Sequence, residues 1–293
     1  MEDHREMFSV TLMSTALEVS RSGYYAWRGR PPSAREMANQ ELVEDIKAVH
    51  KDSREVYGSP RVYWELKARG VLCSRNRVAR LMRLNHIQGK HRRRYKVTTK
   101  ANGAHPVAPN LLKRDFTATR PNEKWLADIS YIPTYEGWLY LAVLLDLYAR
   151  RVVGWAMSSR MSVQLPLDAL HMAIQRRHPG PGLIHHSDRG SQYTSVEYQR
   201  MLKRYGIQAS MSSTGNCYDN APVESFFGTL KGECVDHQQY QSRAEAKVSI
   251  FDYIEIFYNR QRLHSTLGYV SPLAYEQAAY QQHEPSLTLC LQN

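Results

Sequence analysis

The sequence of 293 residues lacks the features of membrane and secreted proteins. No apolar run approaches the roughly 18 residues that cross a membrane, and the polar start MEDHREMFSV is unlike a signal peptide. The four cysteines, Cys73, Cys217, Cys234 and Cys290, are widely scattered and form no C-x-x-C pair. This argues against a zinc site and against a disulfide framework. We therefore expect a soluble cytoplasmic protein with reduced thiols.

Acidic residues are scarce in the first part of the chain, and the excess positive charge lies there. Residues 1–115 hold 23 Lys and Arg against 12 Asp and Glu, whereas residues 116–293 hold 16 of each kind. The whole net charge of +11 therefore comes from the first part. This favours a polyanionic partner, and the basic first part would then bind phosphate backbones. From composition alone, a solvated basic surface without a partner stays open.

The first part of the chain divides into predicted helical segments. Residues 1–33 predict a short helical segment, and the Pro31-Pro32 pair ends it. Residues 34–96 predict a helical DNA-binding domain with helices over Arg35–Lys51, Arg61–Arg69 and Arg75–Leu84. The third helix has the layout of the recognition helix in a helix-turn-helix, and its basic residues, with the run that follows, are the expected DNA contacts: Arg75, Arg77, Arg80, Arg83, Arg92, Arg93 and Arg94. A small helical bundle with a basic face is the alternative.

From residue 121 the pattern changes to strands. Residues 97–120 predict an interdomain linker, because they are polar and contain few apolar residues. The strands and helices of residues 121–280 follow the order βββαβαβα, which predicts a mixed sheet with helices on its faces. The expected strands are 124–132, 138–147, 152–158, 183–186 and 207–211, and the expected helices are 165–177, 195–205, 224–233 and 243–260. The tail, 281–293, is expected to fray.

Three acids in the second part of the chain stand in unusual local contexts. Asp128 lies inside the strand-like run EKWLADISYI, where an unpartnered charge is costly. Asp188 ends a short apolar run, and ligand sites gather at such strand ends. Glu224 opens a predicted helix after a polar loop. Each acid also has a structural explanation: a solvated edge-strand acid, a turn aspartate, or a first-turn acid favoured by the helix dipole.

Brought together, three carboxylates would repel one another, and a divalent cation would remove that repulsion. Oxygen ligands suit Mg²⁺ or Mn²⁺, and two such ions can activate a nucleophile and stabilise a leaving oxygen. We therefore expect Asp128, Asp188 and Glu224 to bind two Mg²⁺ or Mn²⁺ ions. Lys231 lies two helical turns after Glu224, where it can contact a phosphate.

Other residues compete for these roles. Asp146 ends the apolar run LAVLLD and is a rival ligand, while Asp219 fits better as a loop residue. His185 and His186 precede Asp188 directly. An oxygen-rich site favours core or supporting positions for both histidines.

Four motifs, taken together, resemble the transposases of bacterial insertion sequences. They are LADISYI, HHSDRGSQYTS, GNCYDNAPVESFFGTLKGE and YNRQRLHSTLGYVSP. The narrower resemblance is to the large-frame product of the family that makes its transposase by frameshifting between two overlapping frames. YGSPRVYWELKARG with SRNRVARLMRLNHI is similar to that family's helical DNA-binding region, so the resemblance covers most of the chain.

The resemblance implies an α/β fold of the RNase H-like, integrase-core type. In such a fold a mixed five-stranded sheet with flanking helices follows an all-α, helix-turn-helix-like region. The family's D, D and E catalytic residues fall on Asp128, Asp188 and Glu224, with 35 residues between the last two, and its basic residue falls on Lys231. The implied activity is metal-dependent cleavage of insertion-sequence ends to a free 3′-OH and transfer of that end to another DNA strand. The implied partners are terminal inverted repeats, target DNA and further copies of the chain.

The family's transposase usually carries a further helix-turn-helix and a leucine zipper from the first frame. Residues 1–60 show no sustained heptad pattern. We therefore expect either the large-frame product alone or a chain that acts with an upstream-frame protein or fusion. Two alternatives stay open: an RNase H-like nuclease without strand transfer, and a non-catalytic DNA-binding regulator.

Overall fold

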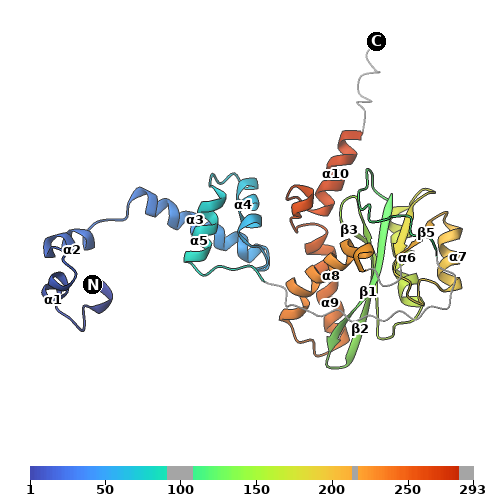
Figure 1. Cartoon of the computed structure of the whole chain (residues 1–293), viewed down its shortest axis with the longest axis horizontal. Coiled ribbons are helices and arrows are strands. Elements are labelled where there is room, and N and C mark those ends of the chain that lie inside the picture. The colour runs from blue at the N-terminus through green and yellow to red at the C-terminus, as the bar shows by residue number, and fades with distance from the viewer. Residues whose placement is uncertain (91–107, 213–216, 284–293) are drawn as a thin grey trace, which may run out of the picture.

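The computed structural model describes residues 1–90, 108–212 and 217–283 and consists of a helical part followed by an α/β part (Figure 1). Within these residues no helix combines the length and the apolar character needed to cross a membrane. Two short helices precede a bundle of three longer ones, and the elements are η1 (Glu2–His4), α1 (Val10–Ala16), α2 (Arg21–Arg28), α3 (Ala34–Asp52), α4 (Ser59–Ala68) and α5 (Arg75–Leu84). The bundle helices lie within two residues of the predicted ranges.

Local sequence signals set the ends of these helices. The side chains of Ser20, Ser33 and Ser74 each accept a hydrogen bond from the backbone N–H three residues further on. Glu36 completes a capping box by accepting from the Ser33 N–H at 2.7 Å. The bundle is then held by an apolar core whose fully buried members are Ile46, Val49, Val62, Leu66 and Val78. Burial of one such side chain stabilises the fold by about 1.5–3 kcal/mol.

The α/β part is built on a mixed five-stranded sheet with the order β3-β2-β1-β4-β5. The strands are β1 (Lys124–Thr134), β2 (Gly137–Asp146), β3 (Arg151–Ser158), β4 (Ile184–Ser187) and β5 (Gln208–Met211). The first three form the predicted antiparallel meander, and β4 and β5 run parallel to β1. The predicted fold class is confirmed.

Helices cover both faces of this sheet (Figure 1). Alternate side chains of the long strands face opposite layers: Leu126 and Val143 belong to one apolar core, and Trp125 and Leu144 to the other. The first core includes residues of α8 (Ala221–Glu233) and α9 (Arg243–Phe251), and the second includes residues of α6 (Gln164–Arg177) and α7 (Val196–Arg204). Because the start of β1 is buried on both faces, its sequence is continuously apolar rather than alternating.

β3 and α6 approach each other so closely that residue 154 must be glycine. A Cβ at Gly154 would lie 2.3 Å from the carbonyl oxygen of Ala169. A larger residue would push α6 away from the sheet.

The predicted helix 243–260 is not one regular α-helix. α9 ends at Phe251 and continues as a π-helical stretch, η4 (Asp252–Tyr258). Asn259 follows it and forms two hydrogen bonds of 3.0 Å, one to the N–H and one to the carbonyl of Val152. These bonds satisfy the Val152 backbone next to the irregularity between β2 and β3. The prediction was wrong here because the apolar period does not reveal a contact with so distant a strand.

The remaining helical elements are η2 (Cys217–Asn220), η3 (Val235–His237), η5 (Ser265–Leu267) and α10 (Pro272–His283). A buried ion pair fixes the end of α8, because Arg262 donates from Nε and Nη2 to the carboxylate of Glu233 at 2.7 and 2.6 Å. Tyr253 of η4 donates to the same carboxylate at 2.7 Å.

The helical bundle packs against the segment that follows η4. Tyr57 donates to the carbonyl of Gln261 at 3.2 Å and accepts from the N–H of Leu263 at 2.8 Å, while Arg61 donates to the Leu263 carbonyl at 2.9 Å. The buried apolar residues of the bundle and of the α8 side of the sheet form one continuous cluster. The helical bundle and the α/β part are therefore directly joined.

Part of the predicted linker also packs against the sheet. Residues 97–107 lie outside the described residues, but Leu112 is buried, and Leu111 donates its N–H to Ser210 Oγ at 2.9 Å. Met211 donates its N–H to the Pro109 carbonyl at 3.3 Å. This half of the segment follows β5 at the edge of the sheet.

Candidate active site

The ends of β1 and β4 bring two of the three predicted acids side by side. β4 pairs with β1 only along Lys124–Leu126, and Leu126 lies opposite His186. Asp128 and Asp188 each follow that last pair by two residues. Since side chains two residues apart on a strand share a face, both acids belong to the α8 side of the sheet, where the two strands separate.

α8 carries the third acid over the same point. Asn220, directly before α8, donates from Nδ2 to the carbonyl of Ala127 at 3.2 Å and holds the start of the helix next to Asp128. The helix begins at Ala221, three residues before the predicted start, because Pro222 fits the first turn of a helix. Glu224 is an exposed residue of that first turn.

One backbone N–H fixes each aspartate. Ile129 donates to Oδ1 of Asp128 at 2.8 Å, and Gly190 donates to Oδ1 of Asp188 at 2.9 Å. A Cβ at Gly190 would lie 3.0 Å from that same oxygen, so glycine permits the tight turn. Among the described residues, no lysine or arginine forms an ion pair with either carboxylate.

Burial and like charge favour the neutral form of Asp128. Its burial, followed by the charges of Asp188 and Glu224, raises its pKa to about 8, although the Ile129 N–H and Lys231 act in the opposite direction. Burial also raises the pKa of Asp188. Crowded carboxylates with raised pKa values are a typical setting for a divalent cation, and an all-oxygen donor set fits Mg²⁺ or Mn²⁺. In the part of the chain that the structure describes, no three His, Cys, Asp or Glu side chains are close enough to surround a metal ion, so the acids converge without forming a closed ligand shell.

Lys231 adds a positive charge beside the acids. Its Nζ lies 4.9 Å from the centre of the Tyr131 ring, and Tyr131 is three residues beyond Asp128 on β1. The effect of Lys231 on the pKa of Asp128 shows that the two charges interact. The predicted phosphate contact thus lies next to the predicted ligands.

Asp146, the rival ligand, lies in a different environment. It accepts hydrogen bonds from the N–H groups of Asn122 at 2.8 Å and Tyr148 at 2.9 Å, and Arg177 lies 3.6 Å away. Asp219 is also engaged, since it accepts from Asn110 Nδ2 at 3.0 Å and from Arg114 Nε at 3.2 Å. Asp146 therefore holds a corner of the sheet, and Asp219 attaches residues 108–118 to η2.

The two histidines before Asp188 are buried core residues. His185 bonds to the hydroxyl of Tyr198 at 2.8 Å, and His186 bonds to Ser210 at 2.8 Å and to Ser212 at 3.1 Å. Burial lowers the pKa of His185 to about 3 and that of His186 to about 4. Both rings are neutral at physiological pH and fix β4 between its neighbours.

The predicted DNA contacts differ in their surroundings. Arg75, Arg80 and Arg83 are exposed on α5. Arg77 was predicted to face outward, but it is partly buried and donates from Nε to Oδ1 of Asn39 on α3 at 2.9 Å. The predicted phosphate contacts Arg92, Arg93 and Arg94 lie outside the described residues.

Sequence reasoning missed Asn220 as a residue that positions the site. A local signal exists, because asparagine is favoured before a helix that starts with proline. Its partner, the Ala127 carbonyl, lies on a distant strand, and no local pattern identifies it.

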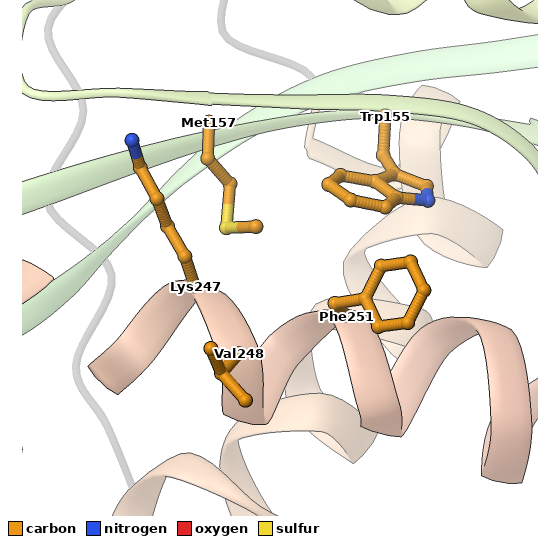
Figure 2. Close-up of a pocket in the computed structure, with 5 residues that line it drawn as sticks. All are labelled: Trp155, Met157, Lys247, Val248 and Phe251. Atoms are coloured by element: carbon orange, nitrogen blue, oxygen red, sulfur yellow. The ribbon is translucent and has the colours of Figure 1, made fainter. Parts of the chain in front are cut away.

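An open groove lies elsewhere, between β3 and α9. Trp155 and Met157 on the strand and Lys247, Val248 and Phe251 on the helix line it, and its volume is about 350 Å³. Figure 2 shows the Trp155 and Phe251 rings facing each other across it. Its lining contains no carboxylate, histidine or cysteine. The groove lies on the edge strand, two strands away from β1, so it is separate from the three acids.

Comparison with protein families gives matches over most of the chain. Residues 37–95 match the family described as HTH-like domain, and residues 118–217 and 224–279 match two families described as integrase core domain. A protein of Shigella sonnei named insertion element IS600 uncharacterized 31 kDa protein is 47% identical over 92% of this chain and 99% of its own length. Transposase InsF for insertion sequence IS3A of Escherichia coli K12 is 44% identical over 94% of this chain and 96% of its own.

Solved structures with a similar shape are much more distant in sequence. A simian T-cell lymphotropic virus intasome chain, solved in complex with a PP2A regulatory subunit, is 16% identical with a TM-score of 0.47, over 83% of this chain and 76% of that one. The HTLV-2 integrase catalytic core, solved with magnesium, is 16% identical with a TM-score of 0.43, over 55% of this chain and 99% of that one.

Proposed function

The chain belongs to the IS3 family of insertion-sequence transposases, and we propose that Asp128, Asp188 and Glu224 are its catalytic residues and bind its divalent metal ions. The family assignment carries the activity, which is cleavage of insertion-sequence ends and transfer of the 3′ end to another DNA strand. The observation that best supports the residue assignment is the strand register. Asp128 and Asp188 stand two residues beyond the last β1–β4 pair, on the face that α8 covers.

Asp128 and Asp188 would hold the cation from the strand ends, and Glu224 would hold it from α8. When bound, Mg²⁺ or Mn²⁺ supplies Lewis-acid chemistry at the phosphodiester, and we propose two ions. Without the cation, Asp128 keeps a proton near neutral pH, because burial and neighbouring acids raise its pKa to about 8. Binding of the cation therefore releases that proton. Lys231 would bind a phosphate oxygen and hold the strand against the acids.

The helical bundle would deliver the DNA. Its HTH-like match and the charge of residues 1–115 support binding of the terminal inverted repeats. Arg75 and Arg80, which are exposed on α5, would contact DNA, and Arg92, Arg93 and Arg94 would follow the phosphates. Arg77 would act differently, by fixing α5 to Asn39. Pairing of two ends requires at least two copies of the chain, and an upstream-frame protein or fusion would add a further DNA contact.

The assignment of the acids is tested with labelled end DNA and Mg²⁺. We expect the wild type to cleave the end and join it to target DNA, and Asp188→Asn to do neither. Asp168→Asn changes an exposed acid on α6 and serves as the matched control. Hydrolysis without joined products would favour a nuclease, and unchanged activity of Asp188→Asn would refute the metal-site assignment.

The DNA-binding assignment is tested by salt dependence. Replacement of Arg92, Arg93 and Arg94 by glutamine should weaken binding to every DNA sequence. It should also flatten the plot of log K against log salt by about 0.9 for each lost phosphate contact. An unchanged slope would remove these three residues from the interface.

A further inference from the structure

Two large aromatic rings stand in solvent at the far end of the β1–β2 hairpin. Tyr131 is 53% exposed and Trp138 is 49% exposed. Their ring centres are 4.9 Å apart and their planes meet at 76°. They belong to neighbouring strands, since Tyr131 pairs with Tyr140 and Trp138 pairs with Pro133, so they share one face of the hairpin and form a corner.

This aromatic corner lies on the same open edge of β1 as Asp128, but on the other face of the strand. β4 stops pairing at Leu126, so among the described residues the outer side of β1 has no neighbouring strand at Tyr131. Tyr131 is three residues beyond Asp128, which is about 10 Å along the strand, or about three base steps of DNA, and its side chain points to the opposite face. Lys231 of α8 connects the two places around this edge, because its Nζ lies 4.9 Å from the Tyr131 ring centre and its charge acts on Asp128.

We propose that Tyr131 and Trp138 form a stacking site for an unpaired base of the DNA strand held at the three acids. This inference rests on the proposed function of those acids. An aromatic ring stacks on any base, and a neighbouring cation binds the phosphate attached to it. Lys231 already lies over the ring of Tyr131, so Trp138 supplies the stacking face, and Tyr131 contacts the edge of the base.

The occupant is an unpaired base rather than a base pair inside a duplex. Inside a duplex both faces of every base are covered by neighbours, and only an unstacked base offers a face to a protein ring. A cleaved or frayed end supplies such a base within a few nucleotides of the phosphodiester that reacts. The aromatic corner would therefore keep the base of the DNA end unpaired and hold the reacting phosphodiester at a fixed distance from the acids.

The test uses the full chain without divalent ions and end DNA that carries 2-aminopurine in a short unpaired overhang. We expect the wild type to quench the fluorescence of this base by stacking. Trp138→Leu should lose the quenching and bind the overhang about tenfold more weakly, and Trp138→Phe should keep part of both. Binding of fully paired, blunt DNA should stay unchanged in both variants.

A matched control is available on α7. Tyr205 is another exposed aromatic residue with a cation beside it, since Arg204 lies 5.8 Å from its ring centre. Tyr205→Leu should change neither the fluorescence nor the affinity for the overhang. Circular dichroism of each variant verifies that the hairpin and the rest of the fold are intact.

The possible outcomes separate this inference from the proposed function. The stacking site would be overturned if Trp138→Leu quenched the 2-aminopurine fluorescence as strongly as the wild type. It would also be overturned if Trp138→Leu lost affinity equally for overhang DNA and for blunt DNA. Loss of self-association in Trp138→Leu with unchanged overhang binding would make the corner a protein interface and would also overturn it. If instead the wild type never joins DNA while Trp138→Leu loses overhang binding selectively, the strand-transfer function fails and the stacking site stands.

Discussion

Asp128 and Asp146 are acids of one sheet that lie on opposite faces with opposite electrostatic surroundings. Asp146 accepts two backbone hydrogen bonds and lies 3.6 Å from Arg177, and burial still raises its pKa to about 6. Asp128 receives one backbone hydrogen bond and has two further acids around it, and its pKa rises to about 8. An arginine lies beside Asp146, whereas two further acids and one lysine, Lys231, lie near Asp128.

Glu276 of α10 sharpens this contrast. It is 1% exposed and forms ion pairs with Arg151, at 2.6 Å, and with Arg177. These two arginines lower the pKa of Glu276 despite its burial. A buried acid with two arginine partners supports the fold. Asp128 and Asp188 form no ion pair with an arginine among the described residues, and their raised pKa values are typical of a site for chemistry.

The largest expected effect comes from Asp188→Asn. Loss of a metal ligand should lower the rate of strand cleavage at least about a thousandfold, because metal catalysis contributes several kcal/mol to the barrier. The metal-free variant should be as stable as the wild type or more so, since the amide removes a like charge near Asp128. Cleavage assays and urea unfolding in EDTA measure the two effects. A large loss of stability would mean that Asp188 resembles Asp146 after all.

The opposite result is expected for Glu276→Gln. Arg151 and Arg177 would lose their shared partner inside the protein, which should destabilise the fold by about 3 kcal/mol. The cleavage rate per folded molecule should stay within about twofold of the wild type, because the change lies on the far side of the sheet. Urea unfolding detects the first effect, and Glu41→Gln on the exposed face of α3 is the control. Lost cleavage with normal stability would assign Glu276 to the active site.

Divalent ions should stabilise the protein through Asp128 and not through Asp146. Mn²⁺ at about a hundred times its dissociation constant should stabilise the wild type by about 2.7 kcal/mol. For a chain of this size that raises the melting temperature by several degrees. Asp128→Asn should lose most of this shift and Asp146→Asn should keep it. An equal shift in both variants would place the ion elsewhere.

The smallest expected effect is a difference in pH dependence. The folded-state pKa of Asp128, about 8, lies above the unfolded value of about 3.9. The folded protein therefore binds more protons between these values, and its stability falls as the pH rises through this window. For Glu276 the folded pKa is lowered, so its contribution is lost as the pH falls.

Urea unfolding in EDTA across this pH range measures the difference. Asp128→Asn should be less sensitive to rising pH than the wild type, by on the order of 1 kcal/mol after allowance for partial exposure. Identical profiles would mean that Asp128 is ionised throughout.

Most elements were predictable because their signals are local. The bundle helices have serine caps and apolar stripes, and the strands of the meander are apolar runs separated by turns. The pairing of Asp128 with Asp188 was different, since it depends on a parallel ladder between strands about 60 residues apart in the sequence. From the sequence positions alone, each of the three acids could equally have a structural role. Only the resemblance to a family indicated that Asp128, Asp188 and Glu224 act together as one site.

The contacts that could not be predicted join distant segments. Arg77 looked like a DNA contact, because Asn39 on α3 gives no sequence signal of the hydrogen bond between them. The π-helical turn of η4 and the ion pairs of Glu276 depend in the same way on partners far along the chain. Local sequence patterns predict where helices and strands begin and end. Which charged side chains are left to bind a ligand depends on how distant segments pack together.

The junction between bundle and α/β part has a consequence for modularity. Tyr57 and Arg61 bind the main chain of residues 261–263, so these hydrogen bonds do not depend on which side chains stand there. The apolar residues of the bundle and of the α8 side of the sheet nevertheless form one cluster. A chimera that receives the bundle of a relative would therefore keep these hydrogen bonds if Tyr57 and Arg61 are retained, but it would also need apolar side chains that fit this cluster.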